Sequence, residues 1–179
     1  MAAQNYKMTN PKYIMMKREA TSDIKRRKIK GKGFLNEYLK ELNRLVITTP
    51  IHAGNLLSLE ETEMIKEKAS GVRALESYKK TIPFEDKEKL RKYLNDLQSI
   101  RDNEFYLFTE YSNYCGAASV PGLNYFNWQF EFTAEHAGII SILLKDLSNE
   151  LILDFYESNN MKLLEIEAFG SSWPNVLID

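Results

Sequence analysis

The apolar residues of this chain change their spacing near residue 100, and this change constrains the fold more than any other feature. Before that point they recur every three or four residues, as on one face of an amphipathic helix. After it they alternate with polar residues, as in strands that have one buried face. The sequence therefore predicts helices in the N-terminal part and a sheet in the C-terminal part.

Three helices are predicted from this spacing and from the signals at their ends. The first covers residues 34–47 and stops before Pro50, because the residue before a proline avoids the helical conformation. The second covers 58–69 and begins with the capping box Ser-Leu-Glu-Glu; its continuation to Tyr78 is left open. The third covers 83–100, with a proline and then two acidic residues in its first turn.

Strands are predicted where apolar and polar residues alternate. The segments with this alternation are 126–133, 140–145, 151–156 and 164–169, and 104–110 is a fifth. The links after the first of these are short, and short links join antiparallel neighbours. We therefore predict an α+β fold, in which N-terminal helices pack on one face of a C-terminal antiparallel β-meander of four to five strands.

The length of 179 residues suits one domain with an N-terminal extension. Residues 1–32 are polar and strongly basic, which predicts a basic arm or a short helix. Residues 33–179 are predicted to form a single α+β domain, with its helices over 34–100 and its sheet over 104–169.

The N-terminus and the cysteine usage indicate a compartment. The first residues lack the apolar core of a signal peptide, and no apolar run approaches the roughly 20 residues that span a bilayer. Cys115 is the single cysteine, so an intrachain disulfide is excluded and a reducing compartment is expected. We expect a soluble cytoplasmic protein without a membrane partner.

Charge is divided unequally between the two parts of the chain. Residues 1–100 hold 21 Lys and Arg against 13 Asp and Glu, whereas residues 101–179 hold 3 against 12. The formal net charge of −1 hides this polarity. Such an asymmetry favours a charged partner rather than a particular reaction.

The predicted strands place acidic and aromatic side chains on the sheet face that the helices leave open. The candidate partner-binding residues, including one aromatic beyond the last strand, are Glu131, Glu150, Asp154, Tyr156, Glu165, Glu167 and Trp173. Like charges on neighbouring strands repel each other, and a basic partner would relieve that repulsion. The alternative is an ordinary solvated sheet face.

A second charged feature is the basic tract near the N-terminus. Its cations are Lys25, Arg26, Arg27, Lys28, Lys30 and Lys32. Such a tract could neutralise several phosphates and bind nucleic acid in a salt-sensitive way. The tract lacks interleaved aromatic residues for base stacking, so pairing within the protein or plain solvation remains the alternative.

No sequence pattern indicates catalysis, a cofactor or a metal site. Cys115 and His136 offer a nucleophile and a base, and Glu135 could orient the imidazole, but nothing in the sequence brings the cysteine to the histidine. Ligand-spaced His and Cys clusters, a Walker loop and a dinucleotide fingerprint are all missing. We therefore predict no enzyme activity, no cofactor and no bound metal.

Three C-terminal stretches carry a resemblance to a known group of proteins. They are residues 134–140 (AEHAGII), 146–151 (DLSNEL) and 164–170 (LEIEAFG). In style they resemble small bacterial immunity proteins of contact-dependent or polymorphic toxin systems. The resemblance implies a protein that binds one cognate toxin domain, often a nuclease, and blocks it. An acidic inhibitor surface would then mimic the charge of the nucleic acid.

Overall fold

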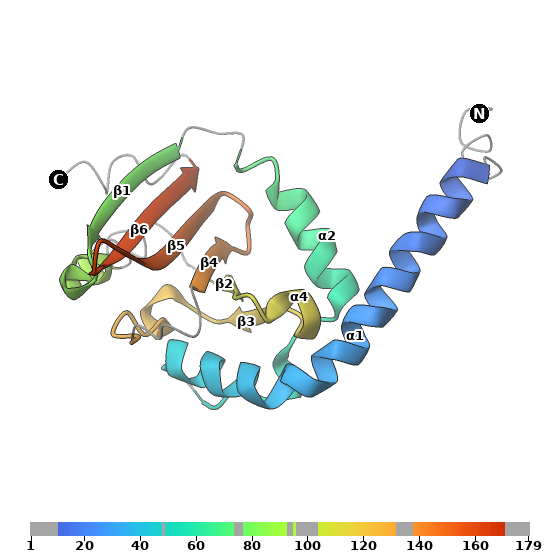
Figure 1. Ribbon diagram of the computed structural model, residues 1–179, viewed down its shortest axis with the longest axis horizontal. Coiled ribbons are helices and arrows are strands. Elements are labelled where there is room, and N and C mark those ends of the chain that lie inside the picture. Colours follow the sequence, from blue (N-terminus) through green and yellow to red (C-terminus); the bar gives the residue numbers. More distant parts are fainter. Residues whose placement is uncertain are drawn as a thin grey trace.

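The computed structural model describes residues 11–47, 49–73, 77–92, 95, 104–131 and 138–170. Its centre is a sheet of six strands (Figure 1): β1 (Ser77–Pro83), β2 (Phe105–Phe108), β3 (Ala118–Val120), β4 (Gly138–Leu144), β5 (Asn149–Ser158) and β6 (Met161–Gly170). The strand order is β1-β6-β5-β4-β2-β3, and every neighbouring pair is antiparallel. The predicted α+β class is confirmed, with six strands rather than four to five.

The described helices are short except for the first. They are α1 (Pro11–Leu45), α2 (Leu59–Ala69) and α4 (Ser112–Cys115), with 3-10 turns η1 (Ala53–Asn55), η2 (Phe84–Asp86) and η3 (Leu123–Tyr125). The predicted capping box at the start of α2 is present. The Ser58 hydroxyl accepts from the Glu61 amide at 3.1 Å, and the Glu61 carboxylate accepts from the Ser58 amide at 2.8 Å.

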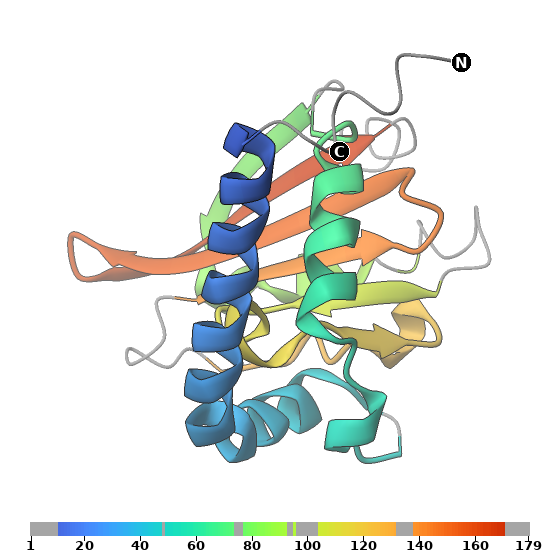
Figure 2. The same ribbon diagram turned by 90° about the vertical axis from the view of Figure 1, so that its right-hand side faces the viewer.

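Helix α1 joins two segments that the sequence predicted to be separate. It is 35 residues long, so the predicted boundary between residues 32 and 33 falls inside it. Figures 1 and 2 show that the helix bends part-way along its length. Gly31 and Gly33 lie in its interior, and glycine pairs are a common cause of helix bends. At Gly31 the helix approaches α4 so closely that a Cβ would overlap the carbonyl oxygen of Tyr114.

Two apolar clusters lie on opposite faces of the sheet. On the first face, Leu151, Leu153 and Ile166 pack with Tyr38 and Leu42 of the second half of α1. On the other face a smaller cluster joins α2 to β2 and β4; its buried members are Ile65, Ala69, Phe108, Ala117 and Leu143. Helices therefore contact both faces, where the alternation predicted one. The second face binds α2 because Phe108 and Leu143, at positions where the alternation places polar side chains, are apolar and pack against this helix.

Residues 77–83 form a strand, so the helical continuation toward Tyr78 is wrong. The segment is β1, an edge strand that pairs with β6 from Ser77 opposite Phe169 to Pro83 opposite Leu163. Pro83 ends this strand and precedes η2, and residues 88–92 are helical. Most of the apolar stripe predicted for the third helix lies outside the described residues, but Leu90 is fully buried.

The described residues of the predicted strand 126–133 form an irregular segment instead. Phe126 makes a single bridge with Val46, and a turn follows it. Phe126 and Phe130 are nevertheless buried, with ring centroids 6.2 Å apart, and Phe130 also lies 5.6 Å from Phe155. The alternating aromatic residues therefore close one end of the core without pairing as a strand.

Candidate functional site

The acidic residues of β5 and β6 form a small patch on the sheet face that carries α2. Asp154 and Glu165 stand directly opposite each other in the β5–β6 register, and Glu167 follows two residues along β6. Their side chains point away from the main core, because Leu153 and Ile166 occupy the alternate positions. Together with Tyr156, these residues are termed the acidic patch.

Charge repulsion in the acidic patch is only partly relieved. Burial and the neighbouring Glu165 carboxylate both raise the pKa of Asp154, while Lys79 lowers it. Lys79 on β1 pairs with Glu165 at 2.6 Å, and this contact raises the pKa of the lysine. Arg73 is a second cation near the patch and interacts with Glu167, but it is already paired with Glu150. The three carboxylates therefore leave the patch negative.

Glu150, predicted as an exposed partner-binding residue, is buried. Only 1 % of its surface is exposed, and Arg73 donates to its two carboxylate oxygens from Nε and Nη2, both at 2.7 Å. The Ser141 hydroxyl donates to the same carboxylate at 2.7 Å. The prediction failed because Arg73 comes from the segment after α2, where no sequence signal links it to β5.

Of the other three residues predicted for the acidic face, the structure places only Tyr156 beside the acidic residues of β5 and β6. Tyr156 is half-buried on β5. Glu131 is exposed on the opposite side of the sheet, where it lines a groove of about 740 Å³ with Glu37 of α1 and with Phe155 of the main core. Trp173 lies outside the described residues.

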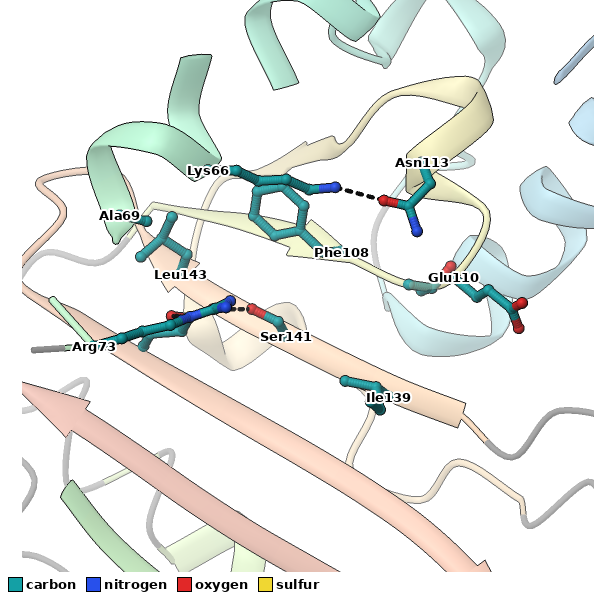
Figure 3. Close-up of a pocket in the computed structure, with 11 residues that line it drawn as sticks. Lys66, Ala69, Arg73, Phe108, Glu110, Asn113, Ile139, Ser141 and Leu143 are labelled. Carbon is teal, nitrogen blue, oxygen red and sulfur yellow. Dashed lines mark hydrogen bonds and ion pairs between the residues drawn. The ribbon is translucent and has the colours of Figure 1, made fainter. Parts of the chain in front are cut away.

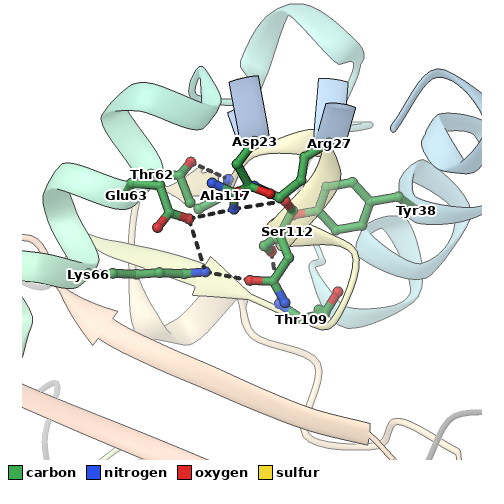
Figure 4. A network of polar contacts seen from close by, with 10 residues as sticks. Asp23, Arg27, Tyr38, Thr62, Glu63, Lys66, Thr109, Ser112 and Ala117 are labelled. Atoms are coloured by element: carbon green, nitrogen blue, oxygen red, sulfur yellow. Dashed lines mark hydrogen bonds and ion pairs between the residues drawn. The ribbon is translucent and has the colours of Figure 1, made fainter. Parts of the chain in front are cut away.

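The basic tract lies on α1 and divides into paired and unpaired cations. Arg27 contacts Glu63 of α2 at 2.9 Å and Asp23 at 3.0 Å (Figure 4). Lys28 contacts Glu60 at 2.7 Å. The carboxylate of Glu63 is the main cause that raises the pKa of Arg27. The exposed cations without an ion-pair partner among the described residues are Lys25, Arg26, Lys30 and Lys32.

A network of polar contacts holds α1, α2 and α4 together beside these ion pairs (Figure 4). Arg27 also donates to the backbone carbonyl of Asn113 at 3.2 Å, and Lys66 donates to the Asn113 side chain at 2.6 Å. The buried Tyr38 hydroxyl donates to the Gly116 carbonyl at 2.8 Å. The Thr62 hydroxyl accepts from the Ala117 amide at 3.0 Å. Because Arg27 contacts both α2 and α4 in this network, we assign it a structural role.

A cavity of about 380 Å³ opens between α2 and the sheet (Figure 3). Lys66 and Arg73 project into it from the α2 side, and Ser141 and Glu150 line it from the sheet. Phe108 and Leu143 add apolar surface. The sequence does not predict this site, because its residues come from four separate segments and match no motif.

No protein-family model, curated protein or solved structure matches this chain. The resemblance to immunity proteins therefore stays a hypothesis. Among the described helices, none combines the length and apolar character needed to cross a membrane.

The described residues offer no geometric support for the alternative of a Cys115–His136 catalytic pair. The Cys115 thiol is half-buried and donates to the Gly31 carbonyl at 3.4 Å, and burial raises its pKa. A raised pKa disfavours the thiolate that a nucleophile needs. His136 and Glu135 lie outside the described residues. Within the described part of the chain, no group of three or more His, Cys, Asp and Glu residues could hold a metal ion.

Proposed function

We propose that this protein is a non-enzymatic immunity protein, which binds a cognate toxin domain through the acidic patch. The observation that carries the proposal is the register pair of Asp154 and Glu165, two carboxylates held opposite each other on rigid strands with Lys79 as their close counter-charge. A basic partner gains from such a surface, since complementary charge speeds encounter and fixes the docking orientation. A nuclease domain has the required basic character where it holds nucleic acid.

The partner that fits the patch is a protein with clustered Lys and Arg side chains around a concave site. Tyr156 lies on the same strand face as Asp154, two residues further along β5, and can supply an aromatic contact within the charged surface. Arg27, Lys28 and Glu150 are excluded from the interface in this proposal, because their charges are already paired within the protein.

The test is capture of partners on the tagged protein from its own cells at low salt, followed by elution with a salt gradient. The proposal expects one stoichiometric basic protein that is released by salt. Purified partner and protein are then compared with the variant Asp154→Asn/Glu167→Gln, which removes two charges of the patch and leaves the Lys79–Glu165 pair intact. This variant should bind at least tenfold more weakly at low salt and with a shallower salt dependence.

Glu131→Gln is the matched control, because Glu131 is an exposed acid on the opposite side of the sheet. It should leave affinity and salt dependence unchanged. If the patch variant binds as tightly as the wild type, or if both variants lose affinity equally, the acidic patch is not the interface.

Nucleic-acid binding through α1 is the second candidate, and one observation favours it. Lys25, Arg26, Lys30 and Lys32 are exposed on a single helix and have no described ion-pair partner. Fluorescence anisotropy with a labelled RNA or DNA duplex over a salt series tests it. Arg26→Gln/Lys30→Gln should reduce the salt slope by roughly 1 to 2, whereas the control Lys40→Gln/Arg44→Gln on the second half of the same helix should not. Absence of salt-dependent binding by the wild type would dispose of this candidate.

A further inference from the structure

The cavity between α2 and the sheet, termed here the α2 pocket, has no role in the proposed interface. Its volume of about 380 Å³ lies in the range of about 300–1,000 Å³ typical of small-molecule sites. Two cationic side chains, Lys66 and Arg73, line it together with apolar side chains of β2 and β4 (Figure 3). This combination suits a ligand with one charged and one apolar end.

Lys66 retains hydrogen-bonding capacity toward the α2 pocket. Its ammonium carries three N–H groups and donates to the Asn113 side chain at 2.6 Å, with Glu63 at 3.7 Å. The lysine also lies 5.9 Å from the centre of the Phe108 ring. Burial is the main cause that lowers its pKa; Arg27 and Arg73 lower it further, and Glu63 opposes them. An anion in the pocket would favour the charged form of the lysine.

Arg73 also has donors to spare. Its Nε and Nη2 bind Glu150, which leaves Nη1 without a hydrogen-bond partner among the described residues. The side chain is 52 % exposed and lines the pocket. Because guanidinium groups present paired N–H donors to oxyanions, Nη1 suits a carboxylate or phosphate oxygen.

The two carboxylates that line the pocket, Glu110 and Glu150, are not placed to bind a cationic ligand. The Glu150 carboxylate is buried and already accepts three hydrogen bonds. Glu110 is exposed at the rim, and Figure 3 shows its carboxylate pointing away from Lys66 and Arg73. A cationic ligand therefore finds no available carboxylate deep in the pocket, whereas an anion finds two cations.

We propose that the α2 pocket binds an organic anion, with its carboxylate or phosphate head between Lys66 and Arg73. Its apolar body lies against Phe108 and Leu143 and reaches toward Ile139, which is 54 % exposed. Ile139 stands opposite Asp154 in the β4–β5 register, so the neutral end of the ligand faces that carboxylate. This inference stands independently of the proposed toxin binding.

Isothermal titration calorimetry of the full chain tests the inference with three probes. The anions 4-phenylbutyrate and phenyl phosphate carry the two possible heads, and neutral 4-phenylbutanamide matches the first in shape. We expect at least one of the two anions to bind, with an affinity about tenfold or more above that of the amide. The tighter of the two anions identifies the head group. Equal binding of the amide, or no binding by either anion, overturns the proposal.

Variants locate the binding within the pocket. Lys66→Met keeps the apolar length and removes the charge, so it should weaken the anion about tenfold; Lys68→Met, an exposed lysine on the same helix, should not. Glu110→Gln should strengthen binding a fewfold by removing a negative charge from the rim. If Lys66→Met unfolds, Ile139→Trp serves as the second test. It narrows the mouth of the pocket at an exposed position and should weaken binding of the anion. Undiminished anion binding by Ile139→Trp, or by folded Lys66→Met, overturns the proposal.

Discussion

Arg73 and Glu150 lie 77 residues apart in the sequence and are joined by two parallel hydrogen bonds of 2.7 Å. This pair connects the segment after α2 to the start of β5. It also supplies a counter-charge to a carboxylate that is buried beside Leu143 of the smaller apolar cluster. The contact is therefore structural, although the same arginine lines the α2 pocket.

Arg73→Gln should destabilise the protein, because it leaves the buried Glu150 carboxylate with Ser141 as its remaining described donor. Removing one partner of a fully buried pair costs about 3–5 kcal/mol. Since Arg73 is half exposed, we expect a smaller loss of about 2 kcal/mol in the free energy of unfolding. Urea denaturation measures it, with Lys68→Gln as the control. A change within about 0.5 kcal/mol of wild type, as for ordinary surface substitutions, would contradict the role given to the pair.

The two glycines inside α1 should respond oppositely to alanine. Gly31→Ala introduces a Cβ that overlaps the Tyr114 carbonyl and should destabilise by about 1–3 kcal/mol, the usual cost of overpacking. At Gly33 no atom lies within 4 Å of the new Cβ, so Gly33→Ala should stabilise by about 0.5–1 kcal/mol through helix propensity. Thermal unfolding of the two variants compares them directly. Effects of the same sign would show that the contact between α1 and α4 is looser than described.

The correctly predicted strands β4, β5 and β6 are joined by short turns and have apolar residues at strict alternate positions. In β4 these are Ile140, Ile142 and Leu144, all buried in the main core. β1 was missed because Tyr78 also continued the helical stripe of the preceding segment, and only its distant partner β6 makes it a strand. β3 has three residues, too few to show a period. Tertiary pairing therefore decides the elements that local pattern leaves ambiguous.

The pH dependence of stability should carry a contribution from Asp154. Burial and Glu165 raise its pKa above the ordinary value of 3.8, so folding favours the protonated form. The resulting stabilisation is complete below about pH 3.8 and is lost as the pH rises through the folded pKa. Asp154→Asn should therefore gain stability relative to wild type as the pH rises from about 4 to 7.

Urea denaturation at several pH values measures this difference, and Glu157→Gln, an exposed acid on the same strand, is the control. A constant difference between wild type and Asp154→Asn across the range would mean that burial and Glu165 do not raise the pKa of this carboxylate. A carbon-detected NMR titration of the Asp154 side chain gives the pKa itself.

Cys115 should react slowly with iodoacetamide. Its pKa is raised by burial and its thiol is bonded to the Gly31 carbonyl, so little thiolate is present near pH 8. We expect alkylation in the folded protein to be slower than that of a free cysteine derivative, and to reach the free rate in urea. Folded-state alkylation faster than the free thiol would revive the nucleophile hypothesis.

The candidate sites were less predictable than the fold, and the reason is physical. The alternation along β5 and β6 correctly predicted that Asp154, Glu165 and Glu167 lie on one face of the sheet. Successive side chains of a strand point to opposite faces, so the face of a residue follows from its position in the strand. Whether a charge on that face is paired depends on residues far away in sequence. Arg73 neutralises Glu150 and Lys79 bridges Glu165, and neither partner carries a local signal. The α2 pocket depends even more strongly on such distant neighbours.

The position of β1 has a consequence for how the chain folds as it is synthesised. β1 hydrogen-bonds with β6, whose paired residues emerge from the ribosome 80 to 92 positions later. Until Met161–Gly170 appear, β1 has no strand to pair with and β5 lacks one of its two neighbours. The sheet can therefore be completed only after β6 has been synthesised, and until then the chain exposes strand edges that chaperones would have to protect.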